Sequence, residues 1–130
     1  MTDYVGFEKT EKFPRIPLRG NLDLTYRCNN NCRHCYINLP AGDREAKEKE
    51  LTISEIGKIA DEAVALGATW CLLSGGEPLL RPDFPHIYTL LKKKGLLISV
   101  FTNATLIDEE TVKLFKRYPP RNIEVTVYGI

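Results

Sequence analysis

Apolar residues in this chain follow two patterns that alternate along the sequence. Four short apolar runs have the length of β-strands, and three longer segments carry apolar residues three or four positions apart, as helices with one buried face do. The predicted strands are Gly20–Thr25, Thr69–Leu73, Leu97–Phe101 and Ile123–Tyr128. The predicted helices run from the capping box Thr52–Glu55 to Gly67, over Asp83–Lys94 and over Glu109–Arg117. The pattern therefore predicts an α/β domain.

The helical segments differ from the charged stretch Gly42–Glu50, which has no apolar face and is expected to be solvated and mobile. In the first helix the residues expected on the buried side are Ile53, Ile56, Ile59, Ala60, Ala63 and Val64. Val112 and Phe115 are the expected core residues of the last helix. The last strand alternates, so Ile123, Val125 and Val127 should face the helices while Glu124, Thr126 and Tyr128 face the other way.

The alternation of strands and helices with short connections predicts a parallel sheet with right-handed crossovers. In such sheets binding and chemistry gather beyond the carboxyl ends of the strands. Four groups of chemically capable residues lie at those ends, namely the cysteines 28, 32 and 35, the turn Gly75–Pro78, Asn103 and Tyr128. The sequence therefore predicts one functional edge.

Composition indicates the size of the domain, its partners and the compartment in which it works. The 130 residues are 43% hydrophobic and 27% charged, which suits one globular domain, and the net charge of +1 gives no reason to expect nucleic acid as a partner. The polar start of the chain does not resemble a signal peptide, and no apolar run approaches the roughly 20 residues of a membrane span. We therefore expect a cytoplasmic protein without a membrane partner, whose clustered thiols stay reduced and bind metal.

Three cysteines, Cys28, Cys32 and Cys35, fall within eight residues directly after the first predicted strand. Three thiolates from one loop suit a soft metal centre, and on a cubane iron–sulfur cluster they would leave one iron open to a further ligand. Zinc is the alternative, with His34 as a fourth ligand, but the adjacent His34 and Cys35 reach one tetrahedral ion poorly. A disulfide is less favoured still.

The turn Ser74–Pro78 is the second chemical signal. Gly75 and Gly76 expose backbone amides and carbonyls and permit positive φ, Glu77 adds an acceptor, and Pro78 stiffens the exit. Such a turn suits the head group of an amino acid, whose ammonium needs carbonyl and carboxylate oxygens around it. Taken alone, a glycine–proline turn is also a common connector.

With these motifs in this order, the chain resembles the radical S-adenosylmethionine (radical SAM) superfamily. Thr102-Asn103-Ala104 looks like that family's Thr-Asn-Gly turn, and Val125–Gly129 is similar to its fourth-strand segment. The resemblance extends from about Leu18 to Gly129. It implies a partial TIM-like (β/α) barrel, here the first four of six β/α units, with residues 1–19 as a lead-in and 20–130 as a truncated core domain.

The resemblance also implies the cofactors. Cys28, Cys32 and Cys35 would hold a [4Fe–4S] cluster, and S-adenosylmethionine would chelate the fourth iron through its amino and carboxylate groups. The turn Gly75, Gly76, Glu77 and Pro78 would hold the methionyl amino group, with Glu77 as its acidic member. An external donor would supply the electron that cleaves the cofactor to a 5′-deoxyadenosyl radical.

Other residues have a family role and a simpler alternative. His34 occupies the position of an aromatic residue near the adenine, or is a surface histidine. Tyr36 either shields the cluster from water or packs. Asn103 bonds the cofactor or only makes a turn, and Thr126 contacts the ribose or is simply a good strand former. Cys71, inside the second predicted strand, is expected to be structural.

The implied function is that of a peptide- or protein-modifying enzyme or a cofactor-maturation enzyme, with a peptide or cofactor precursor as substrate. Four units of a six-unit barrel also suggest a fragment whose last strand leaves an open edge. Two alternatives remain: a non-catalytic truncated remnant that needs a partner, and a small zinc-binding module.

Overall fold

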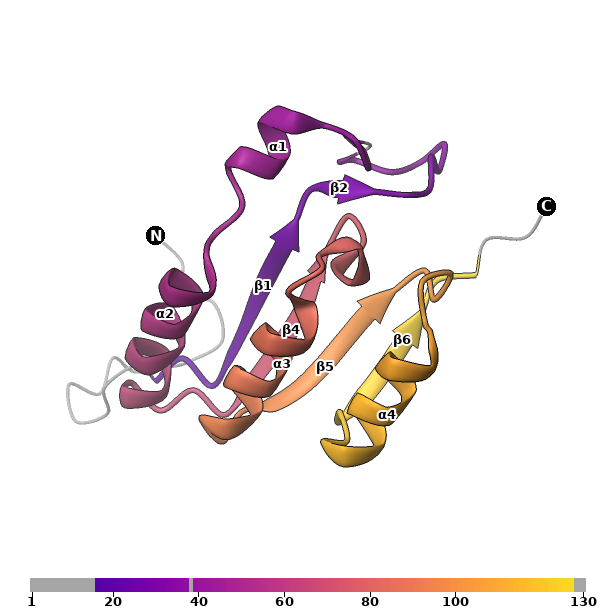
Figure 1. The fold of residues 1–130 in the computed structure, drawn as a ribbon. Coiled ribbons are helices and arrows are strands. Elements are labelled where there is room, and N and C mark those ends of the chain that lie inside the picture. The colour runs from indigo at the N-terminus through magenta and orange to yellow at the C-terminus, as the bar shows by residue number, and fades with distance from the viewer. Residues whose placement is uncertain (1–15, 38, 128–130) are drawn as a thin grey trace, which may run out of the picture.

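The computed structural model describes residues 16–37 and 39–127. Its centre is a sheet of four parallel strands whose order in space is their order along the chain (Figure 1). The strands are β1 (Arg19–Thr25), β4 (Trp70–Gly75), β5 (Leu97–Thr102) and β6 (Asn122–Val125). All neighbouring pairs are parallel. The predicted α/β class and the partial barrel of four β/α units are confirmed.

Three helices connect these strands and lie together along one face of the sheet (Figure 1). They are α2 (Ile53–Ala65), α3 (Phe84–Lys93) and α4 (Glu109–Arg117). Right-handed crossovers that always step to the next strand in the same direction place every helix on the same side. The opposite face of the sheet therefore has no helix over it in the described part of the chain.

The caps predicted for two helices are present. Thr52 and Glu55 form the capping box of α2, and the Asp108 carboxylate accepts a hydrogen bond from the Thr111 amide at the start of α4. These local signals fix where the helices begin.

The core lies between the helices and the sheet. Its fully buried members include Ile56, Leu73, Phe84, Ile87, Tyr88, Ile98 and Val100. Three predicted core residues are wrong, because Ile59, Val64 and Val112 are 46%, 37% and 39% exposed. Tyr88, also fully buried, was not among the predicted core residues. Its hydroxyl donates a 2.7 Å hydrogen bond to the Tyr118 carbonyl, which makes burial of the ring possible.

The segment Gly42–Glu50 is solvated, as predicted, because no residue of its helix is buried, but it has regular structure that the sequence did not indicate. It contains the short helix α1 (Arg44–Glu48), capped by the Asp43 side chain, and it ends in a residue held by an ion pair. Before it, β2 (Arg27–Cys28) pairs with β3 (Leu39–Pro40) and closes the base of the cysteine loop. A one-turn 3-10 helix, η2 (Pro78–Leu80), follows the glycine turn.

Two expectations fall on residues that the structure does not describe. The predicted lead-in, residues 1–19, lies mostly outside the described residues, and so does Tyr128. Among the helices that are described, none combines the length and apolar character that crossing a membrane demands.

Candidate functional site

Most of the predicted site residues meet at one cavity of about 470 Å3 beyond the carboxyl ends of the strands. Of the residues predicted to bind a metal or cofactor, those that line it are Cys28, Cys32, Cys35, His34, Tyr36, Gly75, Gly76, Asn103 and Thr126. They come from the cysteine loop and from the ends of β4, β5 and β6. The parallel topology thus brings together side chains up to about a hundred positions apart in the sequence.

The three cysteines lie half-buried on one short loop, and none of them forms a disulfide. The amide of Cys35 donates to the Cys32 carbonyl at 3.0 Å, which makes a tight turn. The Cys28 sulfur accepts from the Asn30 amide at 3.4 Å and from the Asn103 side-chain amide at 3.8 Å. Both donors help to fix the position of the Cys28 side chain beside the cavity.

The three thiols all line this cavity. Among the described residues, no three His, Cys, Asp or Glu side chains gather into a group that could hold one metal ion. A tetrahedral zinc needs its ligands to converge on one point, whereas a cubane cluster offers a separate iron corner to each thiolate.

The glycine pair is required by the close approach of the chain that leads into the cysteine loop. Gly75 has a φ of 133°, and a Cβ there would lie 2.2 Å from the Thr25 carbonyl oxygen. A Cβ on Gly76 would lie 2.3 Å from the Arg27 carbonyl oxygen. The Gly76 and Glu77 amides donate to these same two carbonyls at 2.7 and 2.9 Å. The turn is thus bonded directly to the backbone preceding Cys28.

Glu77 has a different position from the one expected. Its carboxylate is completely buried and does not line the cavity. It accepts hydrogen bonds from the Leu79 amide at 3.0 Å, the Thr102 hydroxyl at 2.8 Å and the Asn103 amide at 2.7 Å. The protein's own donors occupy it, so its position does not support a direct contact with a cofactor ammonium. It joins the end of β4 to the end of β5 instead.

The other predicted residues differ in exposure. Pro78 is buried at the start of η2 and lies away from the cavity wall. The Asn103 side-chain amide donates to the side-chain oxygen (Oδ1) of Asn29 at 2.9 Å and so contacts the cysteine loop. Tyr36 is 90% exposed, so the packing alternative is wrong. His34 and Thr126 are exposed at the cavity.

Several lining residues were missed. Asn21 and Asp23 on β1, Ser74 on β4 and Phe101 on β5 all line the cavity from the face of the sheet that the helices leave uncovered. Strand periodicity could have indicated them, because residues two apart share a face. They form the floor below the cysteines and the glycine turn.

The comparisons with known proteins identify the family of the chain. The sequence model of the Radical SAM superfamily matches residues 22–130. The chain therefore belongs to the Radical SAM superfamily, a family that uses S-adenosylmethionine.

Individual relatives are much longer than the matched region. The chain is 37% identical over 108 residues to Fe-coproporphyrin III synthase of Methanosarcina barkeri, a match covering 83% of this chain and 26% of that protein. It is 32% identical over 117 residues to the antilisterial bacteriocin subtilosin biosynthesis protein AlbA of Bacillus subtilis, covering 88% of this chain and 24% of AlbA. The chain thus spans about a quarter of the length of these curated relatives.

A solved structure supports the fold. The crystal structure of Streptococcus suis SuiB bound to S-adenosylmethionine superposes with a TM-score of 0.68 at 22% identity, over 83% of this chain and 24% of SuiB. At this identity the likeness establishes the shared fold alone.

Proposed function

We propose that this chain holds a [4Fe–4S] cluster through Cys28, Cys32 and Cys35 and binds S-adenosylmethionine beside Gly75 and Gly76. The main support is the single cavity onto which the thiols and the glycine turn both open. When bound, the two cofactors supply one-electron cleavage of the sulfonium bond, giving methionine and a 5′-deoxyadenosyl radical that abstracts hydrogen from a substrate.

The chain's own residues hold and shield these groups. Asn103 and the Asn30 amide donate hydrogen bonds to the Cys28 sulfur, which orients this ligand toward the cavity in our proposal. In this proposal His34 lies against the adenine, Thr126 contacts the ribose, and Tyr36 limits access of water to the cluster. An external protein donates the electron.

The names of the relatives suggest the substrate class. One is a synthase of an iron porphyrin, and another takes part in making a bacteriocin. We infer that the substrate here is a peptide or a cofactor precursor, modified by a cytoplasmic enzyme. The division into residues 1–19 and a core domain at 20–130 stays a prediction.

The metal centre is tested by anaerobic reconstitution with iron and sulfide. We expect a brown protein with about four irons per chain, whose visible absorption bleaches on reduction with dithionite. Serine at Cys28, Cys32 or Cys35 should each abolish the cluster, because each thiolate holds a different iron corner. Iron, sulfide and absorption measurements check this.

Cys71 is the matched control. Burial in β4 raises the pKa of its thiol to about 11, so it stays protonated near neutral pH and is a poor ligand. Cys71→Ser should leave the iron content unchanged. Tight binding of zinc without inorganic sulfide would contradict the cluster and favour the zinc module.

A further inference from the structure

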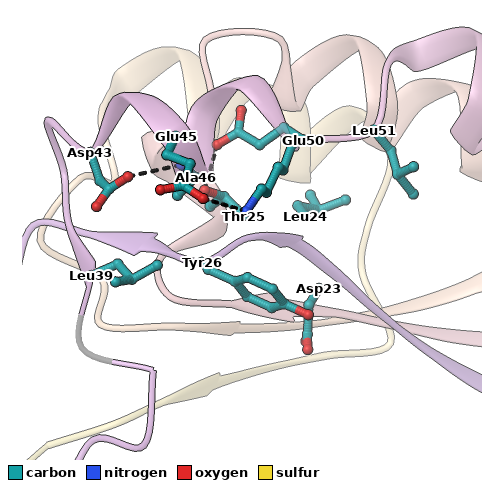
Figure 2. Close-up of a pocket in the computed structure, with 11 residues that line it drawn as sticks. Asp23, Leu24, Thr25, Tyr26, Leu39, Asp43, Glu45, Ala46, Glu50 and Leu51 are labelled. Atoms are coloured by element: carbon teal, nitrogen blue, oxygen red, sulfur yellow. Dashed lines mark hydrogen bonds and ion pairs between the residues drawn. The ribbon is translucent and has the colours of Figure 1, made fainter.

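Glu50 stands out among the charged residues because its side chain is only 11% exposed although it follows a short surface helix. Figure 2 shows it near Thr25, at the wall of a cavity of about 490 Å3 beside α1. One carboxylate oxygen accepts from the Arg27 Nε–H at 2.8 Å and from the Thr25 hydroxyl at 2.5 Å. The other lies 3.9 Å from the Arg81 Nε.

Arg27, the main partner of Glu50, lies at the base of the cysteine loop. It immediately precedes Cys28, and its side chain also donates to the Ala41 carbonyl at 2.8 Å, on the segment that returns from the loop. Its own carbonyl accepts from the Glu77 amide. One side chain therefore joins the two ends of the cysteine loop, and the same residue's backbone holds the glycine turn.

The two arginines depend on Glu50 to different degrees. Arg81 has a second carboxylate, because its guanidinium makes two bonds to Asp83 at 2.9 and 2.7 Å. Arg27, whose side chain is 8% exposed, forms its ion pair with Glu50 and with no other acidic residue in the described part of the chain. A buried charge that loses its partner moves or draws in water. Loss of Glu50 would therefore disturb Arg27 and the cysteine loop, while the start of α3 keeps its ion pair.

We propose that Glu50 is a positioning residue for the cysteine loop. Through Arg27 it sets the geometry of Cys28 and of the Gly75–Gly76 turn, without itself contacting the metal or cofactor. The role in metal retention rests on the proposed function, in which the loop carries a cluster.

The first experiment compares Glu50→Gln with Glu45→Gln in the reconstituted 130-residue chain. Glu45 is a matched control because it lies on the adjoining helix α1, with its side chain 80% exposed in an ion pair with Lys49. Glu50→Gln should lose iron to the chelator ferrozine about tenfold faster and change the EPR line shape of the reduced cluster. Glu45→Gln should match the wild type in both. Equal rates of iron loss in all three proteins would overturn the proposal.

A double variant separates positioning from simple charge balance. Replacing both partners in Arg27→Met/Glu50→Met leaves no unpaired buried charge, so the urea midpoint should recover toward the wild-type value. The link to Ala41 is still missing, so iron loss should stay about tenfold fast. Recovery of both stability and iron retention would show that Arg27 and Glu50 only neutralise each other's charge, and it would overturn the positioning role.

Hydrogen–deuterium exchange of the metal-free chain tests the same role independently of the cluster. Glu50→Gln should speed exchange of amides in residues 28–37 and 75–78 relative to Glu45→Gln, with residues 84–93 unchanged. If the wild type takes up no cluster, the proposed function fails and this comparison still decides the role of Glu50. Unchanged exchange in the loop would overturn it.

Discussion

The Glu77 carboxylate is buried, and it is held by three hydrogen-bond donors from the ends of β4 and β5; no ion pair of Glu77 is seen in the described part of the chain. Two of these donors are backbone amides, which cannot rotate away. A charged acceptor makes such bonds stronger than a neutral one does. At the scale of single residues, the Glu77 side chain therefore connects the ends of β4 and β5, and this structural role fits its contacts better than ligand binding does.

Glu77→Gln tests this assignment. The Gln amide places an NH2 where one oxygen was, so at least one donor faces another donor. The free energy of unfolding should fall by about 1–3 kcal/mol. S-adenosylmethionine should also bind more weakly to the reconstituted protein, because the Asn103 amide loses the carboxylate that anchors it. Urea unfolding and a cofactor titration followed by EPR measure the two effects.

The two readouts distinguish the roles of Glu77. Weaker cofactor binding with unchanged stability would contradict the positioning role and restore the direct ammonium contact expected from the sequence. A loss of stability would support the structural assignment.

Ala104 is strained at the turn where the family usually has glycine. Its φ is 62°, in the left-handed region that costs an L-residue about 1–2 kcal/mol. Ala104→Gly should raise the free energy of unfolding by about 0.5 kcal/mol, since relief of strain exceeds the added entropy of the unfolded chain. Ala63→Gly, in the right-handed backbone of α2, should lower it by about 1 kcal/mol. Urea denaturation of both variants measures these changes. A lower free energy of unfolding for Ala104→Gly would contradict the claim that the backbone is strained at Ala104.

At the scale of elements, the sequence was most informative where signals are local. The capping box at Thr52 and the Asp108 cap lie within four residues of what they bind, so α2 and α4 could be placed closely. The segment Gly42–Glu50 was misjudged because its order depends on Arg27, 23 residues away, and on Arg81. No apolar period in the segment marks such a contact.

The candidate site also has residues that local sequence signals predict and residues whose positions depend on distant contacts. Its cysteines, glycines and Asn103 could be predicted because they directly follow strands of a parallel sheet. The burial of Glu77 could not, since it depends on Thr102 and Asn103 turning back toward β4.

At the scale of the whole molecule, β6 is an edge strand with apolar side chains in water. Ile123 and Val125 are 38% and 47% exposed, and no described strand pairs with the outer side of β6. Unpaired apolar edges promote association between chains. We therefore expect this chain to self-associate in solution.

Val125→Lys should reduce that association, because a lysine on an edge strand opposes pairing with another edge. Val112→Lys is the matched control, since it makes the same change at a 39% exposed valine on α4. Sedimentation velocity over a range of concentrations measures the effect. A wild-type chain that is already a monodisperse monomer would contradict the prediction.

Because the spatial order of the strands is also their order along the chain, the site can assemble during translation. The bonds between the cysteine-loop base and the glycine turn involve Thr25, Arg27, Gly76 and Glu77, so they can form once residue 77 has emerged. Glu50 is already present at that moment. Thr102 and Asn103 arrive later and lock Glu77 in place. The contacts that join the base of the cysteine loop to the glycine turn can therefore form before the contacts that bury the Glu77 carboxylate.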